Sequence, residues 1–172
     1  GLAPGLLYDL RFDGAGQPRA DFVLNQPAFA GVDVLIAGSN YGCGSSREHA
    51  VWGMQQYGFK AVVASSFGEI FYSNALNNRL LLAMVDEADV QAFMAEAAAL
   101  PGPLPLTIDV SQRVVRSPGH SAGFVLSDRH QRMFLQGLDV IGVSLAWLPL
   151  LAGLLWPPLS KREWGLMLPP IL

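Results

Sequence analysis

A short polar motif carries the residues of this chain that are best suited to chemistry. Residues 44–50 read Gly-Ser-Ser-Arg-Glu-His-Ala and follow an apolar run at 32–37 and a glycine-rich loop at 38–44. A strand, a flexible loop and a helix start bring backbone N–H groups, two hydroxyls and a guanidinium to one point, where a carboxylate or phosphate can bind. The first interpretation is therefore an anion-binding site.

The spacing within the motif predicts where the next helix begins and ends. Ser45 and Glu48 have the spacing of a capping box, and Gly58 is a typical helix end. Arg47 then lies in the first turn, where a cation opposes the helix dipole and a bound anion would remove the mismatch. The alternative from spacing alone is a tight turn and a capped helix with a solvated Arg47, since glycine-rich turns are common.

The rest of the chain predicts the elements that position this motif. Apolar runs at 32–37, 61–65 and 80–85 alternate with helix-start signals at Ser45 and Ser66, which is typical of a βαβαβ unit with parallel strands. Further elements are an amphipathic helix at 86–100, a hairpin from 106–110 and 114–116, and a short helix at 128–136 that ends at Gly137. The predicted product is one compact α/β domain.

Composition narrows the class of protein. A chain of 172 residues that is 51% hydrophobic can bury one sizeable core. A net charge of −3 without a basic run argues against binding to nucleic acid. Residues 1–4 lack the blocks of a signal peptide and one cysteine cannot form an internal disulfide, so we expect a reducing cytoplasm.

Residues 34–82 carry a specific family pattern. They contain Gly-Ser-Asn-Tyr-Gly-Cys-Gly-Ser-Ser-Arg-Glu-His-Ala, Tyr-Gly-Phe-Lys and Ser-Ser-Phe-Gly-Glu-Ile-Phe-Tyr-Ser-Asn. The segment resembles the small subunits of 3-isopropylmalate dehydratase, the swivelling domain of the aconitase superfamily. Weaker matches at 7–12, 21–25 and 136–142 extend the resemblance over most of residues 5–145. It implies a swivelling β/β/α domain at 1–145, similar to the aconitase C-terminal domain, around the βαβαβ core.

The resemblance implies a hydro-lyase subunit of leucine biosynthesis. Such enzymes convert 2-isopropylmalate to 3-isopropylmalate by dehydration and rehydration, with a [4Fe-4S] cluster on a separate large subunit as Lewis acid. By motif match, Ser45 is the catalytic base, and Ser46 and Arg47 bind the substrate carboxylates. The supporting positions are Asn40, Gly42, Gly44, Glu48 and His49. This chain alone is expected to bind no metal and to be inactive without its large subunit.

Other functions stay open at this point. The chain could be the small subunit of a related 2-hydroxy diacid dehydratase of the homoaconitase or citramalate type, or a non-catalytic remnant that binds an anion. If Ser45 is only an N-cap, its loss would cost about 1 kcal/mol of stability and leave the chemistry nearly intact.

Several residues are better explained by structure than by chemistry. Glu48 is expected to close the capping box, and His49 to support the loop through a hydrogen bond. Cys43 is predicted to be an unreactive loop thiol, because one cysteine cannot hold a cluster and neither His120 nor His130 has ligand spacing to it. The remaining assignments are surface positions for His120 and His130 and core packing for Phe67, Ile70 and Phe71.

Two features depart from the family. Its first strand and a loop with an Asp-Thr-Asp-like segment are expected before residue 1, so the substrate clamp would be incomplete here. Residues 146–172 are rich in Leu, Trp and Pro where a polar helical tail is expected, and residues 140–160 carry no charge. Such a run can span a membrane, but Pro149, Pro157 and Pro158 argue against a helix. We rank a changed reading frame or divergent tail first, a partner-docking arm second and a membrane span last.

Truncation after Leu145 is expected to leave the thermal unfolding transition nearly unchanged and to raise solubility. The three charged residues of the tail are adjacent, at 161–163, so they cannot give a helix a polar face. The exposed Leu and Trp side chains at 147–156 would form an apolar patch that drives self-association or partner docking. Calorimetry and light scattering on the full and truncated chains measure both effects. Unfolding of the truncated chain would place the tail in the core, and vesicle binding by the full chain alone would support a membrane span.

Overall fold

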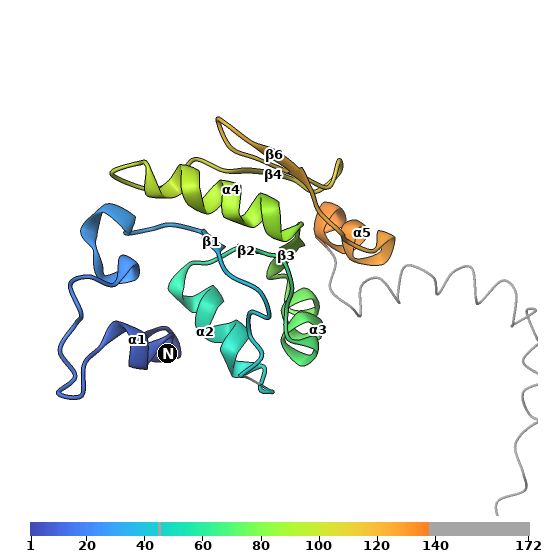
Figure 1. Ribbon diagram of the computed structural model, residues 1–172. Helices are drawn as coiled ribbons and strands as arrows, with labels where there is room; N and C mark the ends of the chain where they lie inside the picture. The colour runs from blue at the N-terminus through green and yellow to red at the C-terminus, as the bar shows by residue number, and fades with distance from the viewer. Residues whose placement is uncertain (45, 138–172) are drawn as a thin grey trace, which may run out of the picture. The chain divides into compact units, whose positions relative to one another are not determined.

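The computed structural model describes residues 1–44 and 46–137 (Figure 1). The predictions for Ser45, for the domain boundary at Leu145 and for the tail at 146–172 lie outside the described residues. No helix in the described part of the chain has the length and apolar character needed to cross a membrane.

A parallel sheet forms the centre of the domain. Its strands are β1 (Val34–Ile36), β2 (Ala61–Ala64) and β3 (Leu81–Met84), in the order β1-β2-β3. All four residues of β2 are buried, as expected for a central strand with both faces covered. The crossover helices are α2 (His49–Tyr57) and α3 (Glu69–Asn77), which lie on one face of the sheet, and α4 (Glu87–Ala98) lies on the other (Figure 1). The predicted βαβαβ core is confirmed.

A second, antiparallel sheet follows α4. It consists of β4 (Thr107–Asp109), β5 (Val114–Arg116) and β6 (Ser121–Gly123), in that order. The hairpin of the first two strands is confirmed, whereas β6 was not predicted because only Ala122 of its three small residues is buried. Val125 bridges to Met84 and so joins this sheet to the parallel one, with an N–H to O distance of 3.0 Å. Helix α5 (Asp128–Gln136) ends at Gly137 in a left-handed conformation, as predicted.

The segment before β1 contains only short helices, none of which the hydrophobic pattern predicted. They are the 3-10 turns η1 (Ala3–Gly5), η2 (Val23–Asn25) and η3 (Pro27–Phe29), and the single α-helical turn α1 (Tyr8–Arg11). Side-chain contacts hold the segment before β1 against the rest of the domain. The Tyr57 hydroxyl donates to the Leu24 carbonyl at 2.9 Å, and the Arg11 guanidinium lies 5.1 Å from the centre of the Tyr57 ring.

Both predicted helix starts are wrong. Helix α2 begins at His49 with Glu48 as its N-cap, later than predicted, and the predicted capping box involves Ser45, which lies outside the described residues. Helix α3 begins at Glu69 and not at Ser66, because the backbone carbonyl of Ser66 pairs with the loop before α2. The end of α2 at Gly58 is confirmed, with a φ of 123° that favours glycine.

Some burial predictions also need correction. Phe71 is buried and Phe67 packs against the core, but Ile70 is 54% exposed and does not belong to it. His120 lies at the surface but is half-buried there: its Nε2 lies 2.8 Å from Asp89 Oδ1, and its ring packs on Phe93. His130 is half-buried as well, and burial is the main cause that lowers its pKa.

Candidate functional site

The glycine-rich loop at 38–44 continues the pairing of β1 and β2 beyond the ends of the strands. The Asn40 N–H donates to Ser66 Oγ at 2.7 Å, and the Tyr41 N–H donates to the Ser66 carbonyl at 3.1 Å. The Gly68 N–H in turn donates to the Tyr41 carbonyl at 2.9 Å. This pairing holds the loop at the carboxyl ends of the parallel strands, where ligands bind in open α/β sheets.

Two glycines allow the chain to approach its neighbours closely here. Gly42 has a φ of +80°, and a Cβ built on it would overlap the ring of Phe71. A Cβ on Gly68 would lie 2.8 Å from the Cα of Cys43, which is closer than packed atoms come. Gly44 meets nothing within 4 Å, so space does not require a glycine there. Of the predicted supporting glycines, Gly42 is thus the one that packing demands.

Tyr41 anchors the middle of the loop. Its hydroxyl lies 3.5 Å from the sulfur of Met54, and its ring packs edge-on against Phe71 with 5.5 Å between centres. Burial raises the pKa of the Tyr41 phenol to about 12. The group therefore stays protonated at neutral pH and is unsuited to act as a base there.

A cavity of about 530 Å³ opens beside this loop, within the size range of small-ligand sites. One wall is apolar and comes from the first residues of the chain and from α2: Leu2, Leu6, Leu7, Ala50 and Met54. The other part of the lining comes from the motif and its loop: Gly42, Gly44, Arg47 and His49. The structure thus brings four predicted site residues to one cavity that combines a guanidinium with apolar surface.

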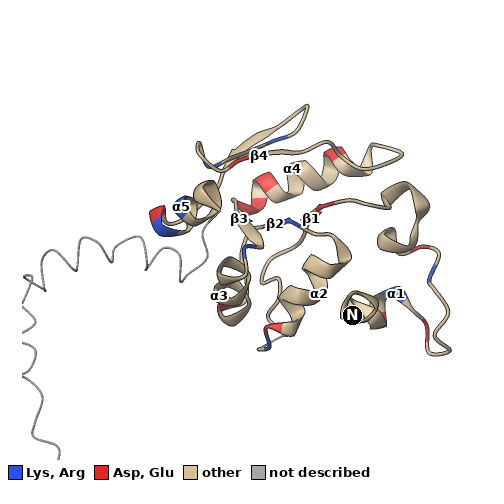
Figure 2. Ribbon diagram, turned by 180° about the vertical axis from the view of Figure 1, so that it is seen from behind, with Lys and Arg blue, Asp and Glu red and all other residues tan. Residues whose placement is uncertain are grey.

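Arg47 lies just before α2 and not in its first turn. Its carbonyl accepts from the Ala50 N–H at 3.2 Å, and the Glu48 carbonyl accepts from the Val51 N–H at 3.0 Å. Figure 2 shows a blue and a red segment next to each other at the start of α2, where this charged pair of neighbours lies. Because these N–H groups are used within the turn, they are not free for a ligand, and the capacity to bind an anion depends mainly on the Arg47 side chain.

Glu48 and His49 contact neighbouring helix residues. Glu48 Oε1 accepts a hydrogen bond from Asn78 Nδ2 at 2.5 Å. The His49 ring packs edge-on against Trp52 with 5.0 Å between centres. Both side chains therefore have structural partners, and the supporting role of His49 through a hydrogen bond stays a prediction.

The Ser46 hydroxyl and the Cys43 thiol lie at the surface. Ser46 is exposed beside Arg47, and the free thiol of Cys43 is exposed as well. Ser45 lies outside the described residues, so its role as catalytic base stays a prediction. Within residues 1–44 and 46–137, no three His, Cys, Asp or Glu side chains are grouped so that they could hold a metal ion.

Sequence reasoning missed several residues of this site. The apolar wall from Leu2, Leu6 and Leu7 had no signal, because their spacing follows no regular helix or strand. Asn78 and Trp52, which contact Glu48 and His49, also carried no signal, because the turn that brings Asn78 to α2 is a tertiary feature.

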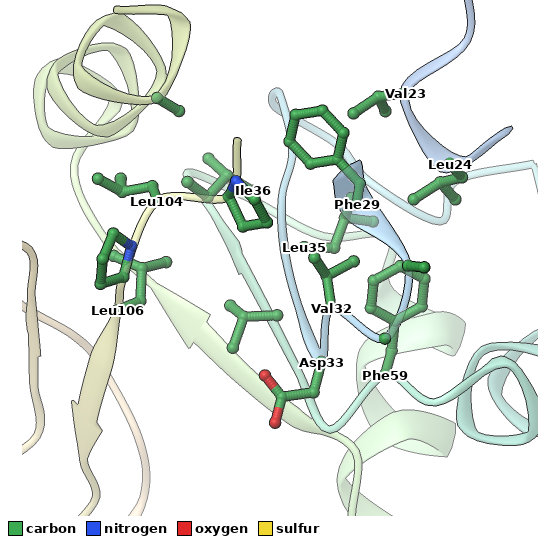
Figure 3. Close-up of a pocket in the computed structure, with 16 residues that line it drawn as sticks. Val23, Leu24, Phe29, Val32, Asp33, Leu35, Ile36, Phe59, Leu104 and Leu106 are labelled. Atoms are coloured by element: carbon green, nitrogen blue, oxygen red, sulfur yellow. The ribbon is translucent and has the colours of Figure 1, made fainter. Parts of the chain in front are cut away.

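A second cavity, of about 510 Å³, lies along the edge of β1 (Figure 3). Its described lining is apolar except for Asp33, whose carboxylate lies 2.9 Å from Lys60 Nζ. The cavity contains none of the predicted site residues. The part of the lining that the structure describes offers no cation to an anionic ligand, and its one carboxylate already pairs with Lys60, so the candidate site is the cavity beside the loop.

Comparisons with known proteins identify a family that this chain is similar to. The family model of the aconitase C-terminal domain matches residues 3–87, which include the motif and the named cavity lining except Leu2. The chain is 59% identical over 146 residues to 3-isopropylmalate dehydratase small subunit 1 of Chromobacterium violaceum, covering 85% of this chain and 68% of the relative. It is 47% identical over 146 residues to the small subunit 1 of Bordetella pertussis, covering 85% and 72%. The crystal structure of 3-isopropylmalate dehydratase from Methanocaldococcus jannaschii matches with a TM-score of 0.51 at 28% identity, covering 67% of this chain and 65% of that one, just under two thirds.

Gly42→Ala is expected to destabilise the domain, and Gly44→Ala is the matched control. The added methyl group at Gly42 overlaps Phe71 and forces an unfavourable φ, so we expect a loss of about 2–4 kcal/mol in the free energy of unfolding. At Gly44 the methyl group enters open space, so we expect a change within about 0.5 kcal/mol. Urea unfolding followed by circular dichroism measures both. Equal losses in the two variants would contradict this account of the loop.

Proposed function

The chain belongs to the family of 3-isopropylmalate dehydratase small subunits, and from this membership we propose that it forms half of a two-chain hydro-lyase in leucine biosynthesis. The observation that carries the proposal is the cavity beside the loop, which Arg47 and apolar side chains line together. A guanidinium can bind a carboxylate through two parallel hydrogen bonds. The apolar wall suits a branched alkyl group, which favours 2-isopropylmalate over more polar 2-hydroxy diacids.

The reaction requires a proton to leave a carbon beside a carboxylate and hydroxide to depart. A [4Fe-4S] cluster supplies the Lewis acid for the hydroxyl, and we assign it to the large subunit because this chain has one cysteine and a cluster needs three or four thiolates. Arg47 and Ser46 hold the carboxylate and so favour the charge that develops on it. This chain thereby orients the substrate for proton removal.

We assign the base to Ser45, which lies between Gly44 and Ser46 in the sequence. A serine hydroxyl is a weak acid, so its alkoxide needs nearby positive charge, which the guanidinium of Arg47, two positions away in the sequence, can supply. Tyr41 is not a competing base, because burial raises its pKa to about 12. The motif match and these surroundings support the assignment.

The partner and the compartment follow from the same proposal. A small subunit acts together with a large subunit, and Ser46 and Arg47, being exposed in this chain, are accessible to such a partner. We place the enzyme in the cytoplasm. An exposed thiol such as that of Cys43 persists in a reducing compartment, which supports this location.

Activity is expected only when this chain is mixed with a cluster-bearing large subunit. We would combine it with the large subunit of a related bacterial 3-isopropylmalate dehydratase and follow the conversion of 2-isopropylmalate and of several other 2-hydroxy diacids. The relative's own small subunit, mixed with the same large subunit, shows that the large subunit is competent. Turnover by this chain alone, or no turnover in the mixture while the control pair is active, would contradict the proposal.

Two variants separate the base from the carboxylate clamp in the mixed enzyme. Ser45→Ala is expected to lower kcat by a factor on the order of a thousand, because it removes a group needed in the transition state. Arg47→Lys is expected mainly to raise KM, since lysine cannot offer the two parallel hydrogen bonds. Steady-state kinetics measures both, and the thermal transition checks that each variant folds. A Ser45→Ala enzyme with normal kcat would show that the serine is only a structural residue.

A further inference from the structure

The side chain of Asn78, at the end of α3, forms hydrogen bonds with residues at the start of α2. We propose that Asn78 is a positioning residue: it holds Glu48, and through the backbone of Glu48 it sets the place of Arg47 at the rim of the cavity. This positioning role rests on the proposed function for its kinetic test, whereas its test by hydrogen exchange does not.

Both polar atoms of the Asn78 side chain, and its backbone carbonyl, form hydrogen bonds. Its Nδ2 donates to Glu48 Oε1 at 2.5 Å and to the Asn74 carbonyl at 2.9 Å. Its Oδ1 accepts from Trp52 Nε1 at 3.0 Å. Its backbone carbonyl accepts from Gln55 Nε2 at 2.6 Å. A single C-cap residue of α3 therefore binds three residues at the N-cap and along α2.

The three partners on the α2 side lie at spacings that share one face of a helix, since Trp52 and Gln55 follow Glu48 by four and seven positions. The partners also fix which way the Asn78 amide points. An indole N–H can only donate and a carboxylate can only accept, so the oxygen must face Trp52 and the nitrogen must face Glu48. Aspartate has no N–H to offer Glu48, and alanine offers neither group.

Glu48 connects the contact with Asn78 to the backbone of Arg47. It is the N-cap of α2, and its carbonyl accepts from the N–H groups of Val51 and Trp52 at 3.0 and 3.2 Å. Arg47 precedes it directly, and the Arg47 carbonyl accepts from the Ala50 N–H at 3.2 Å. Asn78 thus holds the side chain of Glu48, and the backbone bonds to Ala50, Val51 and Trp52 hold the carbonyls of Arg47 and Glu48. Together these contacts fix the position of the Arg47 backbone. Release of Asn78 would let this turn move relative to the cavity.

Asn78→Ala in the mixed enzyme is expected to lower kcat/KM by about tenfold to a hundredfold, mostly through KM, since a displaced clamp binds the carboxylate poorly. Asn77→Ala is the matched control, because Asn77 is exposed and adjacent in the sequence. It should keep normal kinetics. If Asn78→Ala leaves kcat/KM at the wild-type value, the positioning role is overturned.

A compensating pair tests the contact itself. Asn78→Asp places two carboxylates against each other and should be at least as impaired as Asn78→Ala. The double variant Glu48→Gln/Asn78→Asp restores one donor, one acceptor and the original net charge of the pair, with the direction of the hydrogen bond reversed. The bond to the Asn74 carbonyl is lost in both Asp variants, so their comparison isolates the contact with residue 48. The double variant should have a clearly higher kcat/KM than Asn78→Asp. A double variant no better than Asn78→Asp would overturn the proposal.

Hydrogen exchange on the chain alone provides the measurement that needs no activity. Asn78→Ala should speed exchange at the amides of Ala50, Val51 and Trp52 and leave β2 and β3 unchanged, while Asn77→Ala should match the wild type. Unchanged exchange at these three amides would overturn the proposal. If the wild-type mixture showed no turnover, the proposed function would fail, and the exchange result would still decide whether Asn78 fixes this turn.

Discussion

The backbone pairing between the loop at 38–44 and residues 66–68 is the constraint on which the site depends. Backbone N–H and C=O groups beyond the ends of parallel strands need hydrogen-bond partners. Here the loop after β1 and the residues after β2 form hydrogen bonds with each other. The close approach is compatible with packing because Gly42 lies over Phe71 and Gly68 lies over Cys43. The loop therefore leaves the sheet at a defined place, and the motif that follows it reaches the cavity.

The parts of the fold that follow from hydrophobic periodicity could be predicted. The strands of the parallel sheet and α5 with its terminal Gly137 lie where the pattern placed them, because burial and a left-handed glycine leave a local trace in the sequence. The short turns before β1 and the polar strand β6 leave no such trace. Their positions depend on contacts with distant residues, such as Tyr57 with Leu24.

The helix starts show how tertiary contacts override local signals. Ser66 looked like the first residue of a helix, but its backbone and hydroxyl pair with Tyr41 and Asn40 across 25 or more residues of chain. Glu48 looked like the closing residue of a capping box, but its carboxylate is bound by Asn78. In both cases a side chain suited to local capping has a stronger partner elsewhere. Of the residues named from the family motif, Gly42, Gly44, Arg47 and His49 line the cavity, and only the fold could show what holds them there.

The exposure of the motif bears on how the site can work. An arginine–carboxylate contact in open water is weakened by solvation and by salt, so Arg47 in the isolated chain is a poor clamp. A partner that covers the cavity would exclude water and strengthen the same contact. In the proposed function, the Lewis acid also comes from another chain, since one cysteine cannot hold a cluster. Both requirements are met at once if the substrate lies between two subunits, with this chain supplying the carboxylate clamp and its partner supplying the metal.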